Sequence, residues 1–520
     1  MKLPRFMICA GASGSGKTMI TCGILQALKD MGMKVCSFKC GPDYIDPMFH
    51  RQIIGSRTGN LDSFFTEEKM MKRLLCETAS GCRIAVMEGV MGYYDGMGGI
   101  SSEASAYHIS TITETPVVLV VNVKGMSASA AAFINGFKDF KNDSNIRGVI
   151  LNRMPPSLYP ALKDYIEREC GVRVVGYVPE LDDCVIESRY LGLVTPEEIG
   201  DIKAKLRRLS SVLSETVDFK ALLDIANEAA DVEIDVNTNA GIEADTDINV
   251  NAKLNPKCRS YGSECDFRPH ERADDAQLYE SENDLDTPAS GCVRIAVARD
   301  EAFCFIYEEN LRLLSKMGAE IVEFSPLRDE RIPQDVCGMI LYGGYPELYA
   351  DELCGNAAMK DSIRTAIEAG MPVMAECGGF MYLHEYLEGA DGGEYSGVGV
   401  IEGRAFKTDR LTRFGYVELT AENGKDEFFG SCERCKRDER LGGAIGRIPA
   451  HEFHYYDSTS NGDAFTAKKP VGKRSWKCMH SSENMLAGFP HLYYYGNPRI
   501  PQTFLGKCRR FRERRAGCTE

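Results

Sequence analysis

Along the first part of the chain, short apolar runs alternate with stretches whose apolar residues recur at helical spacing. The runs predict strands, and the stretches between them predict helices. The predicted strands are 5–10, 34–39, 83–88, 116–123, 146–151 and 172–178, and the predicted helices include 17–30, 67–78 and 127–140. Residues 117–121 are Val-Val-Leu-Val-Val, a run typical of parallel strands buried on both faces. The pattern predicts an open α/β sheet with ligands at the carboxyl ends of its strands.

The pattern breaks between about 226 and 290, where large apolar residues are scarce and Asn, Asp and Ser are frequent. Such a composition buries too little apolar surface to offset the entropy of ordering. A strand over 293–298, a helix near 306–317 and a strand over 319–324 restore the α/β pattern. We therefore expect an α/β domain over 1–225, a mobile acidic linker over 226–290, a second α/β domain over 291–500 and a basic, frayed tail over 501–520.

The composition and net charge of the chain limit the classes of partner that it can be expected to bind. A chain of 520 residues with 44% apolar and 26% charged residues fits a soluble protein of several domains. Its net charge of −15 argues against a nucleic-acid partner. With no secretory signal and no apolar run long enough to span a membrane, we expect a cytoplasmic protein whose cysteines are mostly reduced. Cys432 and Cys435 have only Cys478 and His480 as further possible zinc ligands nearby in the sequence. A structural role for these cysteines is therefore favoured over zinc binding.

The segment Gly11–Thr18 reads G-x-x-x-x-G-K-T directly after the first predicted strand. In this setting the motif is a phosphate-binding loop, because Gly11, Gly14 and Gly16 let backbone N–H groups curl around phosphate oxygens. Lys17 would reach the β- and γ-phosphates, and the Thr18 hydroxyl would coordinate Mg²⁺. The sequence therefore predicts a nucleoside triphosphate site.

Two further segments contain acidic residues and lie at the carboxyl ends of predicted strands, at the same edge of the predicted sheet as the phosphate-binding loop. They are Gly-Pro-Asp-Tyr-Ile-Asp-Pro over 41–47 and Met-Glu-Gly-Val-Met-Gly over 87–92. Because Mg²⁺ prefers oxygen ligands, Asp43 and Glu88 join Thr18 as candidate ligands. Asp46 would hold a second metal ion or position a substrate. The competing interpretation is that these acids cap the helices that follow.

These segments resemble motifs of the cobyrinic acid a,c-diamide synthase family. So do two longer stretches, Glu-Gly-Val-Met-Gly-Tyr-Tyr-Asp-Gly (88–96) and Glu-Ser-Arg-Tyr-Leu-Gly-Leu (187–193). The N-terminal domain of that family is similar to dethiobiotin synthetase. The resemblance covers 1–210 and 293–500. It implies ATP phosphates at Lys17, Mg²⁺ at Thr18, Asp43 and Glu88, and the reacting carboxylate beside Tyr44 and Asp46. Asn152 matches a position that contacts adenine in related synthetases, although an Asn at a strand end is equally good as a turn former.

In the second domain, Cys377 follows the apolar run 371–374 and precedes two glycines. A nucleophile between a strand and a helix is exposed on a sharp turn, and the helix N-terminus would lower the pKa of its thiol. The backbone amides of Gly344, in Gly-Gly-Tyr-Pro-Glu (343–347), and Gly378 could stabilise an oxyanion. His491 is the candidate base, and His451 and His454 compete with it.

These residues resemble a class I glutamine amidotransferase domain. The resemblance implies that Cys377 is the nucleophile, that His491 is the base, and that His454 lies in a motif facing the acceptor. Such domains usually carry an acid two positions after the catalytic histidine. Here that residue is Tyr493, so the group that orients His491 stays open.

The two resemblances imply ATP- and glutamine-dependent amidation of the a and c carboxylates of cobyrinic acid through acyl phosphates, in cobalamin biosynthesis. The same chemistry on hydrogenobyrinic acid or nickel-sirohydrochlorin is an alternative. So is a partition-type regulatory ATPase with a non-catalytic second domain, although such ATPases usually carry a lysine where this loop has Ala12. Lys39, Arg189 and Arg404 are candidate cationic contacts for the macrocycle. The oligomeric state is left open, with a homodimer as one option.

Overall fold

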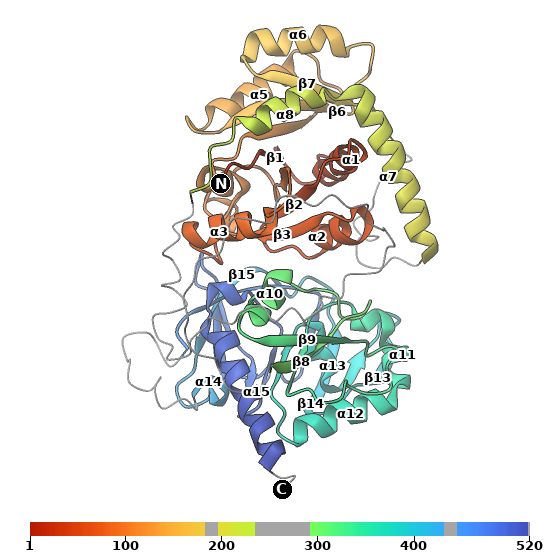
Figure 1. The fold of residues 1–520 in the computed structure, drawn as a ribbon, viewed down its shortest axis with the longest axis vertical. Coiled ribbons are helices and arrows are strands. Elements are labelled where there is room, and N and C mark those ends of the chain that lie inside the picture. The colour runs from red at the N-terminus through yellow and green to blue at the C-terminus, as the bar shows by residue number, and fades with distance from the viewer. Residues whose placement is uncertain (182–195, 234–291, 431–444, 518–520) are drawn as a thin grey trace, which may run out of the picture.

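The computed structural model describes residues 1–181, 196–233, 292–430 and 445–517. Two α/β domains lie one above the other along the long axis of the molecule, with α2 (Ile45–Phe49), α3 (Glu68–Ala79) and β3 (Arg57–Leu61) of one next to α10 (Glu308–Lys316) and β15 (Arg413–Ala421) of the other (Figure 1). The prediction of two domains with parallel sheets is confirmed. No helix among these described ranges is long and apolar enough to cross a membrane.

The first domain is built on a seven-stranded parallel sheet in the order β3-β2-β4-β1-β5-β6-β7. Its strands are β1 (Arg5–Ala10), β2 (Val35–Cys40), β3 (Arg57–Leu61), β4 (Ile84–Glu88), β5 (Val117–Asn122), β6 (Ile146–Asn152) and β7 (Arg173–Val178). Each central strand is buried along its length, as the unbroken apolar runs predicted. Strand β3 was not predicted, because Arg-Thr-Gly-Asn-Leu carries no apolar run.

Helices cover both faces of this sheet (Figure 1). They are α1 (Lys17–Asp30), α2 (Ile45–Phe49), the π-helix η1 (His50–Ile54), α3 (Glu68–Ala79), the short η2 (Met97–Gly99), α4 (Ala106–Ile112), α5 (Ser129–Asp139), α6 (Tyr159–Cys170), α7 (Pro196–Thr216) and α8 (Phe219–Asn227). The domain continues past the predicted boundary, since Val232 is buried and its carbonyl accepts a hydrogen bond from the Met1 ammonium at 2.7 Å. Residues 234–291 of the predicted linker lie outside the described residues.

The second domain centres on a six-stranded sheet in the order β20-β21-β11-β10-β8-β9, parallel except for β20. Its strands are β8 (Val293–Ala298), β9 (Ala319–Phe324), β10 (Gly338–Leu341), β11 (Val373–Glu376), β20 (His480–Ser481) and β21 (Met485–Gly488). The helical segments of this domain are α10 (Glu308–Lys316), η5 (Pro346–Tyr349), α11 (Ala350–Gly355), α12 (Ala357–Glu368), α13 (Gly378–Tyr382), α14 (Glu427–Gly430), η8 (Tyr494–Gly496) and α15 (Arg499–Gly517).

Two further sheets, which were not predicted, complete this domain. One is antiparallel and holds β19 (Ser475–Cys478), β18 (Phe465–Lys468), β15 (Arg413–Ala421), β16 (Ile448–His454) and β22 (His491–Leu492) in that order. The other holds β13 (Glu394–Ser396), β12 (His384–Glu388), β14 (Ile401–Lys407) and β17 (Tyr456–Ser458). The antiparallel sheet matters for function, because β15 reaches the first domain (Figure 1).

The prediction of a frayed basic tail is wrong for the described residues. Residues 499–517 form α15, which packs against β8 and β10. Ile500, Phe504, Leu505, Cys508 and Phe511 are buried on one face of it, while Arg514 is exposed. Their helical spacing was hidden among the many basic residues that line the other face.

Candidate active sites at the domain interface

The phosphate-binding loop joins β1 to α1, as predicted. Gly14 and Gly16 have φ values of 74° and 92°, which only glycine adopts without strain. The Lys17 ammonium donates hydrogen bonds to the carbonyl oxygens of Ala12, at 3.0 Å, and of Met91, at 2.6 Å. Lys17 therefore curls into the loop and meets the segment that follows β4, which brings two predicted motifs together.

Asn152, at the end of β6, lies against the same loop. Its side-chain amide donates a hydrogen bond to the Ser15 carbonyl at 2.8 Å, and its oxygen accepts one from the Arg153 N–H at 2.9 Å. A Cβ on Gly16 would lie 2.4 Å from that amide nitrogen. Asn152 thus braces the phosphate-binding loop here, and its contact with adenine stays a prediction.

Four charged side chains meet beside the loop, at the carboxyl ends of β2 and β4. The Lys39 ammonium forms ion pairs with Asp46 and with Glu88, the latter at 2.8 Å, and lies 3.7 Å from Asp43. Burial alone would lower the pKa of Lys39, but the neighbouring carboxylates hold it above its usual value. Burial and the charge of Asp46 raise the pKa of Glu88 to about 8. The predicted acids therefore gather around one buried cation.

The oxygen atoms in this cluster are suitable ligands for Mg²⁺. The Thr18 hydroxyl donates a hydrogen bond to Glu88 Oε1 at 2.6 Å, and Glu88 Oε2 has no hydrogen-bond partner. A hydroxyl and carboxylate oxygens are the ligand type that Mg²⁺ takes beside phosphate oxygens. Within the described residues no cluster of three His, Cys, Asp or Glu side chains forms a complete metal site. Oxygen atoms of the bound nucleotide would therefore have to complete the coordination shell of Mg²⁺.

The helix-capping interpretation of Asp43 is also realised. Asp43 Oδ1 accepts hydrogen bonds from the backbone N–H groups of Ile45, at 2.9 Å, and Asp46, at 3.2 Å, at the start of α2. Its other oxygen is the one that faces Lys39. The two roles are compatible, because a carboxylate has two oxygens.

The second predicted site lies where β11 ends. Cys377 has φ 48° and ψ −106° between β11 and α13, which is the predicted strained turn, but its side chain is buried rather than exposed. A Cβ on Gly343 would lie 2.5 Å from His491 Cε1 and 3.3 Å from Cys377 Cβ. Gly343 therefore lies close to both the nucleophile and its predicted base.

The two predicted oxyanion amides are neighbours. A Cβ on Gly378 would lie 3.0 Å from the Gly344 backbone nitrogen, so the two residues lie close together, while their role as an oxyanion site stays a prediction. The expectation of a lowered thiol pKa is not met, because burial raises the pKa of Cys377 and the Gly378 N–H only partly offsets it. Burial also lowers the pKa of His491 well below its usual value, so both groups are neutral in this structure.

Sequence reasoning missed the carboxylate beside His491. Glu376 Oε2 lies 3.8 Å from His491 Nδ1, and both side chains are almost fully buried. The sequence held a signal for it, because Glu376 directly follows a buried apolar run and ends β11, where a buried acid needs a partner. Tyr493, at the position where an acid is usual, instead stacks on Phe65 of the first domain at 5.3 Å.

The competing histidines have other contacts. His454 is buried, its Nδ1 lies 2.6 Å from the Tyr456 carbonyl, and its ring stacks on Phe489 at 4.0 Å. His454 Nε2 lies 3.7 Å from Glu452, and the His451 ring lies 6.1 Å from that of His491. Neither ring is among the nearest atoms to the turn at Gly343, whereas His491 is.

The two sites touch each other through Tyr44. Its ring lies 5.1 Å from the ring of His491, 4.4 Å from Tyr307 and 5.3 Å from Phe305, although it belongs to the same turn as Asp43. Tyr44 is buried, and its hydroxyl has no partner. The placement of Tyr44 beside the reacting carboxylate stays a prediction, but this structure places it against the catalytic histidine candidate.

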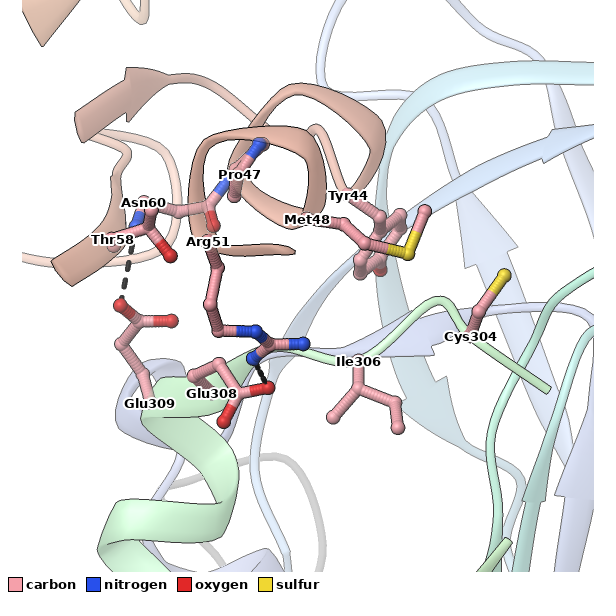
Figure 2. A pocket seen from close by; sticks show the side chains of 11 residues that line it. Tyr44, Pro47, Met48, Arg51, Thr58, Asn60, Cys304, Ile306, Glu308 and Glu309 are labelled. Atoms are coloured by element: carbon pink, nitrogen blue, oxygen red, sulfur yellow. Dashed lines mark hydrogen bonds and ion pairs between the residues drawn. The ribbon is translucent and has the colours of Figure 1, made fainter. Parts of the chain in front are cut away.

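Polar contacts surround this junction (Figure 2). Arg51 forms an ion pair with Glu308, and the Asn60 N–H donates to Glu309 Oε1 at 3.2 Å. Figure 2 also shows Cys304 and Ile306 of the second domain lining the same pocket as Tyr44. The second domain thus packs on the α2 turn and on the edge strand β3 of the first sheet.

One of the predicted macrocycle contacts, Arg404, does not join the site. Arg404 lies in β14, where it forms an ion pair with Glu394 at 3.3 Å, and β14 lies on the side of its domain away from the first sheet (Figure 1). Arg189 and the motif 187–193 lie outside the described residues, as do Cys432 and Cys435. Lys39 is at the centre of the charged cluster, as described above.

Comparison with known proteins identifies both domains. Residues 6–190 match the CobQ/CobB/MinD/ParA nucleotide binding domain, and residues 294–498 match the CobB/CobQ-like glutamine amidotransferase domain. Cobyrinate a,c-diamide synthase of Priestia megaterium is 34% identical over 513 residues, covering 98% of each chain. The chain belongs to the cobyrinate a,c-diamide synthase family.

Other members of this family align as completely. The synthase of Thermoplasma volcanium is 34% identical over 99% of each chain, and that of Caldanaerobacter subterraneus is 35% identical over 97% of this chain and 98% of its own. The resemblance found in the motifs is thereby confirmed. As a member of the family, the chain is a ligase with a nucleotide-binding domain and a glutamine amidotransferase domain.

Proposed function

We propose that this chain uses ATP and glutamine to amidate the a and c carboxylates of cobyrinic acid in cobalamin biosynthesis. The observation that carries the proposal is the meeting of the two sites. His491, the candidate base beside the Cys377 turn, packs on Tyr44, which belongs to the same turn as Asp43 in the first domain. A chain with both sites so close can pass ammonia from one to the other.

At the glutaminase site, His491 takes the proton of the Cys377 thiol and the sulfur attacks the glutamine amide carbon. The oxyanion that forms lies toward the N–H groups of Gly344 and Gly378. The C–N bond then breaks, His491 returns the proton to the leaving nitrogen, and ammonia departs. Water hydrolyses the thioester and releases glutamate.

At the synthetase site, the γ-phosphoryl group of ATP passes to a substrate carboxylate and ADP leaves. The carboxylate needs this step because it is a poor electrophile without a leaving group. Lys17 offsets charge on the transferring group, since its ammonium already lies in the loop. Ammonia attacks the acyl carbon, the bond to the phosphate oxygen breaks, and phosphate leaves with an amide as the product.

Thr18, Asp43 and Glu88 would hold Mg²⁺, which when bound neutralises charge on the phosphates. Lys39 keeps the buried carboxylates of Asp46 and Glu88 compensated in this structure. Burial raises the pKa of the Asp46 carboxyl, but Lys39 and the other neighbouring groups together hold that pKa below its usual value. The alternative of a regulatory ATPase is not adopted, since it gives no role to the turn at Cys377.

The test is mass spectrometry of cobyrinic acid incubated with the protein, Mg-ATP and glutamine. We expect two successive mass changes, each that of replacing a hydroxyl by an amino group, with ADP and phosphate released. Cys377→Ala should form no product from glutamine, and ammonium should restore it. Hydrogenobyrinic acid and nickel-sirohydrochlorin are run in parallel. ATP hydrolysis without a mass change in cobyrinic acid would overturn the assignment of this substrate.

A further inference from the structure

The buried acid at the end of β11 lies beside the candidate base of the glutaminase site, and both groups lack partners. Glu376 and His491 are only 2% and 1% exposed. Glu376 Oε2 lies 3.8 Å from His491 Nδ1, while Glu376 Oε1 and His491 Nδ1 have no hydrogen-bond partner. A buried polar atom without a partner is costly in free energy, so an acid retained here calls for a role.

Backbone contacts fix the carboxylate at this point. Glu376 is the last residue of β11 and pairs with Gly488 of β21. Its Oε2 accepts a hydrogen bond from the Leu492 N–H at 3.3 Å. Because Leu492 and His491 form β22, that bond ties the carboxylate directly to the strand that carries the imidazole. The closeness of the two side chains therefore follows from the placement of β11 and β22.

The nucleophile is attached to the same strands. The Cys377 N–H donates a hydrogen bond to the Gly488 carbonyl at 2.8 Å, which continues the pairing of β11 with β21. A Cβ on Gly343 would lie 3.3 Å from Cys377 Cβ, 2.5 Å from His491 Cε1 and 3.4 Å from His491 Nδ1. The acid, the base and the nucleophile thus lie around one point, where β11 ends.

The surroundings of His491 offer no competing acid. Glu376 is the one carboxylate at ion-pair distance from its ring nitrogens among the residues that the structure describes. The neighbouring rings are those of Tyr44 at 5.1 Å, His451 at 6.1 Å and Phe305 at 6.4 Å. None of these three side chains is a carboxylate, so none can replace Glu376 as an anionic acceptor for the Nδ1 proton.

The other two positions at which an orienting acid could be sought have different contacts. Position 493, where an acid is usual, holds Tyr493, whose ring stacks on Phe65 of the first domain at 5.3 Å. Glu452 Oε2 lies 3.7 Å from His454 Nε2, and His454 Nδ1 lies 2.6 Å from the Tyr456 carbonyl. Glu452 therefore pairs with a different histidine.

We infer that Glu376 is the positioning residue of His491. This inference rests on the proposed function, which assigns the proton transfer to His491. Glu376 accepts the Nδ1–H, which fixes the tautomer and leaves Nε2 free to take the thiol proton of Cys377. The carboxylate then stabilises the imidazolium until its proton passes to the leaving nitrogen of glutamine. The orienting acid thus comes from the strand before the nucleophile, and position 493 is free to pack against the first domain.

The structure shows this pair before the hydrogen bond has shortened. Burial raises the pKa of Glu376 to about 8, which the Leu492 N–H only partly offsets, and burial lowers the pKa of His491 well below its usual value. A hydrogen bond to the ionised form lowers the pKa of an acid, so a closer Nδ1–H favours the carboxylate. The separation of 3.8 Å fits a catalytic hydrogen bond that tightens when substrate binds.

The first test is glutamate release by Glu376→Gln in the full chain. We expect kcat to fall by roughly 10²- to 10⁴-fold with KM for glutamine little changed, because the amide keeps the shape of the side chain but does not fix the tautomer. Partial recovery in Glu376→Asp, which keeps the carboxylate, would add support. A kcat within about twofold of the unaltered chain would overturn the inference.

The matched control is Glu309→Gln, in α10 of the same domain. Glu309 is equally buried, its Oε2 has no hydrogen-bond partner, and its Oε1 accepts a backbone N–H, that of Asn60, at 3.2 Å. Its ion pair is with Arg312 rather than with a histidine. We expect kcat within about twofold of the unaltered chain. A loss as large as that of Glu376→Gln would show that any buried carboxylate matters here, which contradicts a specific role.

A second measurement needs no variant of Glu376. Nitrogen NMR of the chain with ¹⁵N-labelled histidine rings reports which ring nitrogen carries the proton, and His491→Gln identifies the resonances of His491. At the pH of highest glutaminase activity we expect the proton on Nδ1. A proton on Nε2 alone would sink the inference, because Glu376 would then have no proton to accept.

Cys377→Ala separates this inference from the proposed function. If that variant releases no glutamate while Glu376→Gln retains full activity, only the role of Glu376 is wrong. If Cys377→Ala releases glutamate as fast as the unaltered chain, the glutaminase site is misassigned and both proposals fail. A large loss in Glu452→Gln with none in Glu376→Gln would give the positioning role to Glu452 and would likewise reject this inference.

Discussion

At the scale of single residues, both sites depend on side chains that lie very close to the backbone of a glycine. Gly343 leaves room for His491 and Cys377 to lie side by side, and the Cys377 backbone has a conformation that few side chains tolerate. Close packing around them therefore helps to hold the catalytic groups in place. His491 Nδ1 itself has no hydrogen-bond partner here.

This arrangement makes Gly343 sensitive to a single methyl group. Gly343→Ala should abolish most glutaminase activity, at least about 10²-fold, because its Cβ would lie 2.5 Å from His491 Cε1. Glutamate release measures it. The matched control is Gly355→Ala at the end of α11, where a Cβ meets nothing within 4 Å and activity should persist. Equal activity in the two variants would contradict the described geometry.

At the scale of elements, the sequence predicted the parallel strands well because buried strands are continuous apolar runs. The prediction 5–10 matches β1, and 293–298 matches β8. Strands that pair at an interface or lie partly exposed carry no such run, which is why β3, β15 and β16 were missed. Helix α15 was misread for a related reason, since its basic residues outnumber the apolar ones that bind it to β8 and β10.

The packing of α15 gives a test of its structural role. Phe504 is fully buried, so Phe504→Ala should lower the free energy of unfolding by about 3–5 kcal/mol. Arg514→Ala, on the exposed face, should change it by less than about 0.5 kcal/mol. Urea denaturation measures both. Similar small losses in the two variants would show that the helix is not docked.

At the scale of the whole molecule, the interface between domains is the part that sequence could not reveal. Tyr44, Phe65 and Tyr416 each belong to one domain and pack on the other, and no local pattern marks such long-range contacts. The motifs did reveal the chemistry of each site. What they could not show is that the two sites share a boundary.

One interface carboxylate makes stability depend on pH. Burial raises the pKa of Asp62 to about 7 from 3.8, although the Tyr416 hydroxyl and the Phe64 N–H donate to it. The folded protein therefore binds this proton more tightly than the unfolded chain. The free energy of unfolding should fall as pH rises between those values, and Asp62→Asn should flatten that fall. Denaturation near pH 5 and near pH 8 measures it; an identical pH dependence in the variant would contradict the assignment.

The central claim is that nitrogen released at Cys377 is delivered within the same chain to a carboxylate activated beside the phosphate-binding loop. The direct test supplies glutamine labelled with ¹⁵N in its amide, together with unlabelled ammonium, Mg-ATP and cobyrinic acid. Mass spectrometry of the diamide then reports the source of each nitrogen. We predict ¹⁵N in both new amides. Product that carries the unlabelled nitrogen of the solution would contradict the account.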